Sequence, residues 1–357
     1  MIPYGRQSID EDDIAAVVAV LRGDWLTQGP AVGVFEDSLA AATGARYAVA
    51  FANGTAALHA ACTAGNIGRG DRVATSSLTF IASANCARYT GAEIALVDID
   101  PDTLNIDLEQ VPDQIDALVA VHFGGLPLDL SRLRRRPRLV IEDAAHALGA
   151  VTPDGPVGNC ARSDMCTFSF HPVKHITTGE GGAVTTNSAE LADLLRRFRN
   201  HGIERRPERA DWYYEVVALG WNYRLTDMQA ALGTSQLTKL ERFVSRRNHL
   251  ANRYRELLAD VPLGLPPSAP TGSRHAYHLF PVQVGERDRV ISDLRRRGIN
   301  AQVHYIPVHH HPLYSTHQHS PLPETDRAFQ HLLSLPLYPG LAESDQDKVV
   351  EALRATL

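Results

Sequence analysis

The first candidate for chemistry is a lysine set among small and apolar residues. Lys174 lies in TFSFHPVKHITTGEGGAV, between an apolar segment at 165–170 and a glycine-rich turn at 179–182. Most lysines are solvated surface groups, but few charges flank this one, which favours a desolvated amine with a lowered pKa. Such an amine can form a Schiff base with an aldehyde cofactor.

Two acids stand where a predicted strand ends. In RLVIEDAAHALGA, three apolar residues precede Glu142 and Asp143. Ligands of open α/β sheets bind at this carboxyl edge of the strands. Either acid alone would be expected to cap the next helix, but a buried carboxylate here can instead hold a protonated ring nitrogen. Enzymes that use pyridoxal 5′-phosphate (PLP) require such a group.

A third segment, ANGTAALH at 52–59, combines an Asn-Gly turn with the start of a predicted helix. Free N–H groups there, with the hydroxyl of Thr55, would form a phosphate cradle, to which Ser169 could add a contact from the lysine segment. An ordinary strand-to-helix turn explains the pattern equally well. The segment is neither a Walker loop nor a G-x-G-x-x-G, which disfavours a Rossmann-type nucleotide module.

The surrounding pattern predicts an α/β fold that would position these groups. Apolar strands alternate with helical stretches, which indicates βαβ units and a mostly parallel sheet buried on both faces. The strands are expected at 47–51, 72–76, 93–99, 117–123, 138–143 and 165–170, with helices at 55–63 and 82–89. One long charged helix at 236–259 is followed by a Pro-rich patch and a smaller unit, with a strand at 278–284, a helix at 286–298 and a strand at 299–307. We therefore predict a large domain at 1–240 and a small C-terminal α/β domain at 241–357.

Composition sets limits on partners and location. Hydrophobic residues make up 44% and charged residues 21% of the 357 residues, typical of a soluble globular protein. The formal net charge of −6 provides no field for nucleic acid or anionic membranes. The N-terminal segment lacks a signal-peptide layout, and no run reaches the roughly 20 apolar residues that span a bilayer. The four cysteines form no CxxC pair, so we expect reduced, mostly buried thiols in a cytoplasmic protein.

These parts occur in an order that resembles the DegT/DnrJ/EryC1/StrS sugar aminotransferases along essentially the whole chain. The matching segments are LTQGPAVGVFE, NGTAALH, DIDPDTLNID, EDAAHALGA, SFHPVKHITTGEGGAV, RNHG, GWNYRLTDMQAALG and QVHYIPVH. The combination is specific, although single pieces are not. The resemblance implies the PLP-dependent transferase fold of type I, with PLP as cofactor and its pyridoxamine form (PMP) during turnover.

The resemblance also implies roles for the residues of the site. Lys174 would form the Schiff base and then move the proton during transamination, while Asp143 would pair with the pyridinium nitrogen. The phosphate would be held by Thr55, the backbone amide of Ala56 and Ser169.

Three further positions match the family. Phe80, in SSLTFIAS, would stack on the cofactor ring, and His146 would lie near its phenolic oxygen. Asn222, in GWNYRLTD, would reach the phosphate held by the neighbouring subunit, which implies a homodimer with shared active sites. Without the resemblance, Phe80 would be interpreted as a core aromatic and Asn222 as a turn residue.

The implied reaction is a ping-pong transfer of an amino group from L-glutamate to a nucleotide-linked keto sugar. The lysine segment and AQVHYIPVHHHPLY look most like the branch that acts on UDP-2-acetamido-2,6-dideoxy-β-L-arabino-hex-4-ulose, for pseudaminic acid and surface polysaccharides. Other UDP-, dTDP- or GDP-linked 4-keto sugars remain open. A sugar dehydratase of the family would carry His in place of Lys174, and a non-catalytic PLP-binding regulator would lack the lysine or the aspartate.

Three more residues are candidate substrate contacts. His304 and His309 lie in a histidine-rich stretch that we interpret as a loop over the substrate entrance, with an ordinary solvated loop as the alternative. Arg205, in RRPER, could pair with a diphosphate through its guanidinium group. We expect no metal site, because the spacing at 309–311 is too tight for a chelating face and no carboxylate or cysteine partner is evident.

Overall fold

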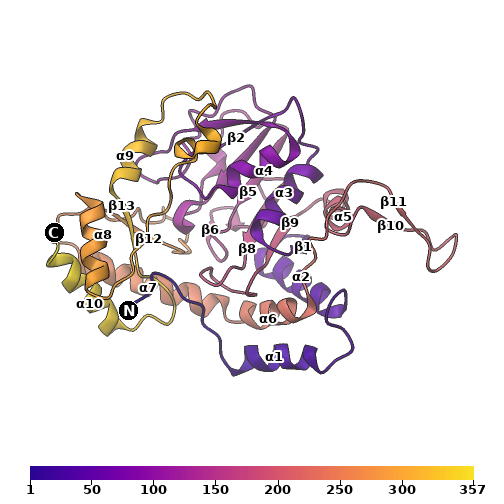
Figure 1. The fold of residues 1–357 in the computed structure, drawn as a ribbon, viewed down its shortest axis with the longest axis horizontal. Helices are drawn as coiled ribbons and strands as arrows, with labels where there is room; N and C mark the ends of the chain where they lie inside the picture. The colour runs from indigo at the N-terminus through magenta and orange to yellow at the C-terminus, as the bar shows by residue number, and fades with distance from the viewer.

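A computed structural model describes all 357 residues (Figure 1). Its centre is a seven-stranded sheet in which only β9 runs antiparallel to its neighbours. This confirms the predicted α/β fold with a mostly parallel sheet. In spatial order the strands are β1 (Tyr47–Phe51), β9 (Gly182–Thr186), β8 (Met165–Ser169), β5 (Leu139–Asp143), β4 (Ala117–Val121), β2 (Arg72–Ser76) and β3 (Glu93–Val97).

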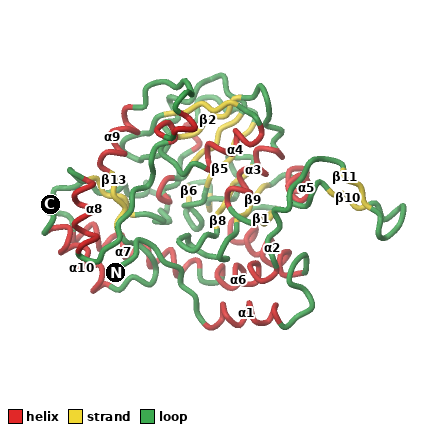
Figure 2. The backbone as a smooth tube through the Cα atoms, viewed as in Figure 1, coloured by secondary structure: helices red, strands yellow, loops and turns green.

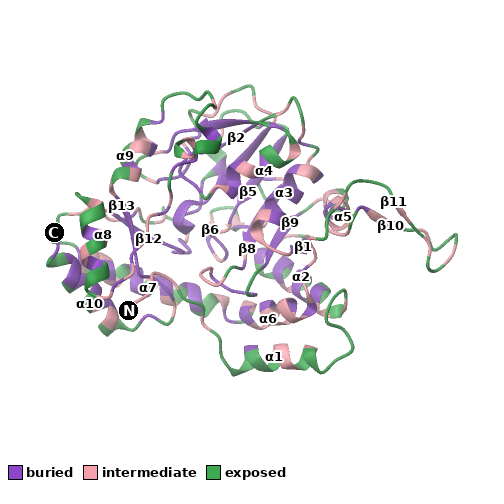
Figure 3. Ribbon diagram, in the orientation of Figure 1, coloured by how far each residue is buried: buried purple, intermediate pink, exposed green.

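Helices cover both faces of this sheet, because successive strand residues point to opposite sides. Val49 packs in a core with helices α3, α4 and α5, whereas its neighbour Ala50 packs in a core with α2 and α6. Figures 2 and 3 show the strands between the helices and their buried residues. The helix bounds are α1 (Glu11–Leu21), α2 (Pro30–Thr43), α3 (Gly54–Ala64), α4 (Ala82–Thr90), α5 (Ala189–Phe198), α6 (Asp227–Leu237) and α7 (Leu240–Leu257).

The predicted long helix at 236–259 is divided in the structure. Helix α6 ends at Leu237 and α7 begins at Leu240. In the intervening turn, the hydroxyl of Thr238 donates to the carbonyl oxygen of Ser235 at 2.7 Å. Such local bonds from Thr compete with continued helical pairing.

A second apolar core is built from residues between Leu250 and Leu353. It contains α8 (Arg287–Arg296), α10 (Glu343–Arg354) and a two-stranded antiparallel sheet, and α9 (Pro323–His331) precedes the second strand. The strands are β12 (Phe280–Gln283) and β13 (Leu332–Leu335). The domain boundary at residue 240 stays a prediction; it coincides with the start of α7.

The predicted strand at 299–307 is wrong. The ladder with β12 is taken by β13, whose four residues LLSL are all buried. The segment at 299–307 makes only isolated bridges, between Ile2 and Ile299 and between Gln302 and Ser334.

The remaining elements are short. They are β6 (Val151–Thr152), β7 (Gly155–Pro156), β10 (Ile203–Arg205), β11 (Tyr214–Val216) and the 3₁₀ turns η1 (Phe123–Gly125), η2 (Leu130–Arg132), η3 (Val308–His310) and η4 (Pro312–Tyr314). The β10–β11 hairpin projects away from the sheet (Figure 1). All four cysteines are free and buried, as predicted. No helix combines the length and the apolar character that crossing a bilayer would need.

Candidate active site

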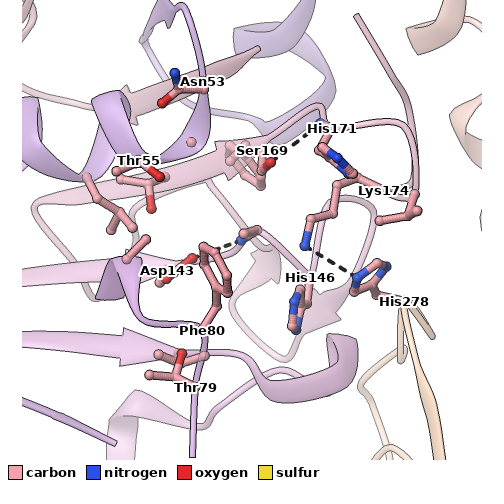
Figure 4. Close-up of a pocket in the computed structure, with 18 of the residues that line it drawn as sticks. Asn53, Thr55, Thr79, Phe80, Asp143, His146, Ser169, His171, Lys174 and His278 are labelled. Atoms are coloured by element: carbon pink, nitrogen blue, oxygen red, sulfur yellow. Dashed lines mark hydrogen bonds between the residues drawn. The ribbon is translucent and has the colours of Figure 1, made fainter. Parts of the chain in front are cut away.

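A cavity of about 650 Å³ opens at the carboxyl ends of β4, β5 and β8 (Figure 4). This size is within the range of small-molecule sites. Most of the residues predicted for the site line this cavity, together with several that the sequence did not single out. The lining includes Thr55, Ala56, Phe80, Asp143, His146, Ser169, Lys174, His278, His304 and Tyr305.

Lys174 places its amine in this cavity without a carboxylate partner. Its Nζ donates to Nε2 of His278 at 3.3 Å. Burial lowers the pKa of Lys174 to about 8, with Asp143 opposing the shift and Arg247 adding to it. The chain has only three lysines, and the other two are ion-paired: Lys239 with Asp10 and Asp13, and Lys348 with Asp345. Lys174 is therefore the one lysine suited to act as a nucleophile near neutral pH.

This lowered pKa predicts how the amine reacts with an aldehyde. Only the neutral amine attacks a carbonyl, so the rate of PLP attachment to cofactor-free enzyme should rise about tenfold per pH unit below 8 and level off above it. Stopped-flow absorbance across pH 6 to 10.5 would measure the profile. A rate that still rises steeply to pH 10 would mean an ordinary, solvated lysine, whose pKa is about 10.4.

Asp143 is the last residue of β5 and faces the same cavity. It is buried, and its Oδ2 accepts a hydrogen bond from Ser83 Oγ at 2.7 Å. The Ser83 hydroxyl is in turn 2.8 Å from that of Thr79. These bonds, made by Ser83 in α4 and by Thr79 just before it, hold the carboxylate in one orientation.

The neighbouring acid points the other way. Glu142 Oε2 lies 2.8 Å from Nε2 of His122, and its Oε1 accepts from the Ser163 hydroxyl. Alternation along the strand therefore separates the two carboxylates and leaves one of them at the cavity. The sequence alone did not distinguish these two environments.

The start of α3 forms the predicted cradle, with one correction. The amide of Ala56 donates to the N-cap side chain, Asn53 Oδ1, at 2.8 Å and is therefore already satisfied. The amides of Gly54 and Thr55 have no partner and remain for an anion. A Cβ at Gly54 would come within 3.0 Å of Ser169 Cβ, so glycine is what allows this close approach.

Phe80 and His146, the two ring side chains predicted for the site, both line the cavity. Phe80 is 53% exposed and lines the cavity, so it is no core aromatic. His146 accepts from the Gly124 amide at Nδ1, 3.3 Å away, and its Nε2 lies 2.9 Å from the Tyr305 hydroxyl. The ring thus carries its hydrogen on Nε2. Burial holds the pKa of His146 well below its ordinary value, so the ring is neutral.

Tyr305 and His278 are two of the lining residues that sequence reasoning missed. Tyr305 lies in the QVHYIPVH segment and its ring is 5.7 Å from that of Phe80. His278 comes from the loop before β12, and burial keeps its pKa well below the ordinary value. Tyr305 had a signal, since it belongs to a motif already singled out, whereas His278 had none.

The candidate substrate contacts separate into one that lines the cavity and two that do not. His304 lines it, with Nδ1 held 2.9 Å from the Ser334 hydroxyl. His309 does not line it, because its ring is held between Ser77 and Asp326; its contact with the substrate stays a prediction. Sequence reasoning had found no carboxylate near these histidines.

Arg205 and Asn222 also lie away from the cavity of their own chain. Arg205 belongs to the projecting β10–β11 hairpin and lines a separate cavity of about 780 Å³, so its contact with a diphosphate stays a prediction. Asn222 is exposed and pairs through its backbone with Asn200. Its contact with a neighbouring subunit stays a prediction.

His175, next to the reactive lysine, does not compete for the same place. Its Nε2 donates to the Ala276 carbonyl oxygen at 3.0 Å. The histidine therefore packs into the core while Lys174 reaches the cavity.

These groups fit a phosphorylated pyridine aldehyde. The cavity holds an amine with a lowered pKa for the aldehyde and a carboxylate for the ring nitrogen. It also offers free helix amides for the phosphate and an aromatic face for the ring. Each group suits one part of PLP, and they line one continuous space (Figure 4).

Comparison with known proteins agrees with this fit. Residues 7–354 match the DegT/DnrJ/EryC1/StrS aminotransferase family. The chain is 39% identical over 376 residues to the spore coat polysaccharide biosynthesis protein SpsC of Bacillus subtilis, covering 99% of this chain and 96% of that protein.

Two solved structures share the fold over nearly their whole length. Spr1654 of Streptococcus pneumoniae, described as a sugar aminotransferase and solved in its PMP-form, has a TM-score of 0.94 at 26% identity, with 100% and 99% of the two chains covered. PseC of Helicobacter pylori, an aminotransferase involved in the biosynthesis of pseudoaminic acid, has a TM-score of 0.90 at 28% identity, with 99% and 98% covered. The chain belongs to the DegT/DnrJ/EryC1/StrS family and is a PLP-dependent sugar aminotransferase.

Proposed function

We propose that this enzyme transfers an amino group from L-glutamate to the C4 keto group of a nucleotide-linked 4-keto-6-deoxy sugar. The observation that carries the proposal is that a buried lysine amine, a buried carboxylate and a free helix N-terminus all line one cavity. The regulator alternative is disfavoured because Lys174 and Asp143 are both present. The dehydratase alternative is disfavoured because Lys174 occupies the position where that branch has histidine.

In this proposal Lys174 binds the cofactor and moves the proton. The cofactor, when bound, supplies an electron sink that allows a C–H bond next to nitrogen to be broken. Lys174 Nζ would take that proton from the donor carbon and deliver it to the cofactor carbon that receives the nitrogen. It would make the reverse transfer when the keto sugar is aminated. Its pKa of about 8 suits both tasks near neutral pH. His278 Nε2, 3.3 Å away, orients the amine.

The other groups hold the cofactor and keep it charged. The Asp143 carboxylate keeps a proton on the ring nitrogen, and Ser83 and Thr79 hold that carboxylate in place. The Gly54 and Thr55 amides and the Ser169 hydroxyl would hold the phosphate. Phe80 would stack on the ring, and His146 would lie near its phenolic oxygen.

For the sugar we propose UDP-2-acetamido-2,6-dideoxy-β-L-arabino-hex-4-ulose, as in a pathway to pseudaminic acid. The likeness to PseC supports this choice, and the identity to SpsC supports a role in making surface polysaccharide. His304 lines the cavity, which supports its proposed contact with the sugar.

The decisive experiment offers a panel of substrates to the enzyme in its PMP form. UDP-, dTDP- and GDP-linked 4-keto-6-deoxy sugars would be supplied singly, with products identified by mass and NMR. We expect amination at C4, fastest with the UDP-linked 2-acetamido sugar. A faster dTDP- or GDP-linked substrate would overturn the sugar assignment alone. Deoxygenation without amination would favour a dehydratase, and no reaction with any member would contradict the function.

We also propose that the active unit is a homodimer. The β10–β11 hairpin and the residues after it expose large apolar side chains that one chain leaves uncovered, Trp212, Tyr214, Val216, Leu219 and Trp221. An isolated two-stranded hairpin with such a surface is marginal in water without a partner. Sedimentation of the purified enzyme should give twice the chain mass. If the sites are shared, a mixture of Lys174→Ala and Asn222→Ala subunits should regain activity that neither variant has alone.

A further inference from the structure

Outside the active-site cavity, two histidines and an aspartate direct three ligand atoms to one point. His309 and His310 lie in η3, and Asp326 lies in α9. Nε2 of His309 is 3.0 Å from Asp326 Oδ1, and Nε2 of His310 is 2.9 Å from the same oxygen. One ligand atom from each residue falls within 4.8 Å of the others. The close spacing of the two histidines in the sequence does not prevent a metal site, because the third ligand, Asp326, comes from α9.

The surroundings orient the cluster as a metal site requires. The hydroxyl of Ser77, directly after β2, lies 2.7 Å from Nδ1 of His309, which fixes the ring with Nε2 toward Asp326. Histidines that bind metals commonly make such a bond through their other nitrogen. The ring of His319 lies 5.0 Å from that of His309, and only its Nδ1 is engaged, with the Ser320 carbonyl oxygen.

Spacing and chemistry also favour an ion over a hydrogen-bonded cluster. The donors of two histidines would ordinarily be shared between the two oxygens of a carboxylate, yet both rings converge on Oδ1, and Oδ2 has no partner. Ligand atoms about 2.0–2.2 Å from a tetrahedral ion are roughly 3.3 Å apart. The two separations that involve the carboxylate, 3.0 and 2.9 Å, need only small shifts to reach that value, and the two imidazole nitrogens lie within 4.8 Å of each other.

We propose that His309, His310 and Asp326 bind one zinc ion, with His319 or water as the fourth ligand. Imidazole and carboxylate donors in this number suit zinc. This replaces the expectation of no metal site, which rested on the tight spacing at 309–311 and on the lack of a carboxylate or cysteine partner. None of the three residues lines the cavity, so the ion would act as a structural clip.

The clip would join three segments that meet beside the active site. It would tie the end of β2, through Ser77, to η3 and to α9. His304 and Tyr305, a few residues before η3, line the cavity. A bound zinc ion would therefore steady one wall of the site without touching the reacting atoms.

The test uses tag-free holoenzyme that has been treated with a chelator and dialysed. Zinc chloride is titrated by calorimetry, and bound metal is counted by mass spectrometry. We expect one zinc per chain, with affinity lowered at least about tenfold in His310→Gln and in Asp326→Asn. His311→Gln removes the adjacent histidine, which is not in the cluster, and should bind as the wild type does.

A second measurement detects zinc binding through the stability of the folded chain. Zinc should raise the Tm of the wild type and of His311→Gln by several degrees, because it binds the folded chain, but should leave Asp326→Asn unchanged. Sub-stoichiometric binding, or equal affinity in all variants, would overturn the proposal. The result is independent of the proposed function, since neither readout uses the sugar or the amino donor.

Discussion

Replacing Lys174 by alanine should abolish transamination, with a fall of at least about 10³-fold in kcat, because the proton-transfer group and the covalent attachment are lost together. The purified variant should also lack a cofactor link that borohydride makes permanent. Peptide mass spectrometry makes this test unusually clean. The chain has only three lysines, so a label on any peptide identifies its residue without ambiguity.

The matched control is Lys348→Ala. Lys348 is exposed and pairs with Asp345 on α10, far from the cavity in the sequence and absent from its lining. This variant should keep the activity and the labelled Lys174 peptide. Lys239 is a poor control, because its ion pairs with Asp10 and Asp13 stabilise the packing of α1. Wild-type protein labelled on Lys239 or Lys348, or an active Lys174→Ala variant, would contradict the assignment.

The sheet could be predicted from the sequence because its strands are short apolar runs buried on both faces. Runs such as ALVAV at 117–121 have few alternatives, and their ends place Asp143 at the ligand edge. The small sheet was harder. LLSL follows directly on α9, and nothing local distinguishes it from the end of that helix, while the alternating segment at 299–307 imitates a strand. Long-range pairing decided between them.

The residues of the site also differ in whether local sequence pattern or long-range contacts determine their positions. Residues tied to a strand end or a helix start, such as Asp143 and Thr55, could be placed from local pattern. His278 and Asp326 could not, because their partners lie 104 and 17 residues away, with no periodicity linking them. The N-cap of α3, in contrast, could have been predicted from local sequence. An Asn at the N-cap accepts from an amide of the first helical turn, so Asn53 Oδ1 binds the Ala56 amide and leaves it unavailable to the phosphate.

Replacing Asp143 by asparagine should reduce kcat about 10²- to 10³-fold while leaving the covalent link to Lys174 in place. The amide has nearly the same shape, so binding of the cofactor should persist. It carries no charge, however, and cannot keep a proton on the ring nitrogen, which weakens the electron sink. Single-turnover kinetics with L-glutamate would measure the loss in the proton-transfer step directly.

Glu142→Gln is the matched control, because it neutralises the adjacent carboxylate on the opposite face of the same strand. Its partners are His122 and Ser163, so this change should lower the Tm but leave kcat within about twofold. A sharper test supplies Asp143→Asn with a cofactor methylated on the ring nitrogen, which is positively charged without any proton. Activity should then recover relative to the same variant with PLP. Equal losses in both carboxylate variants, or no recovery with the methylated cofactor, would show that Asp143 acts through packing and not through its charge.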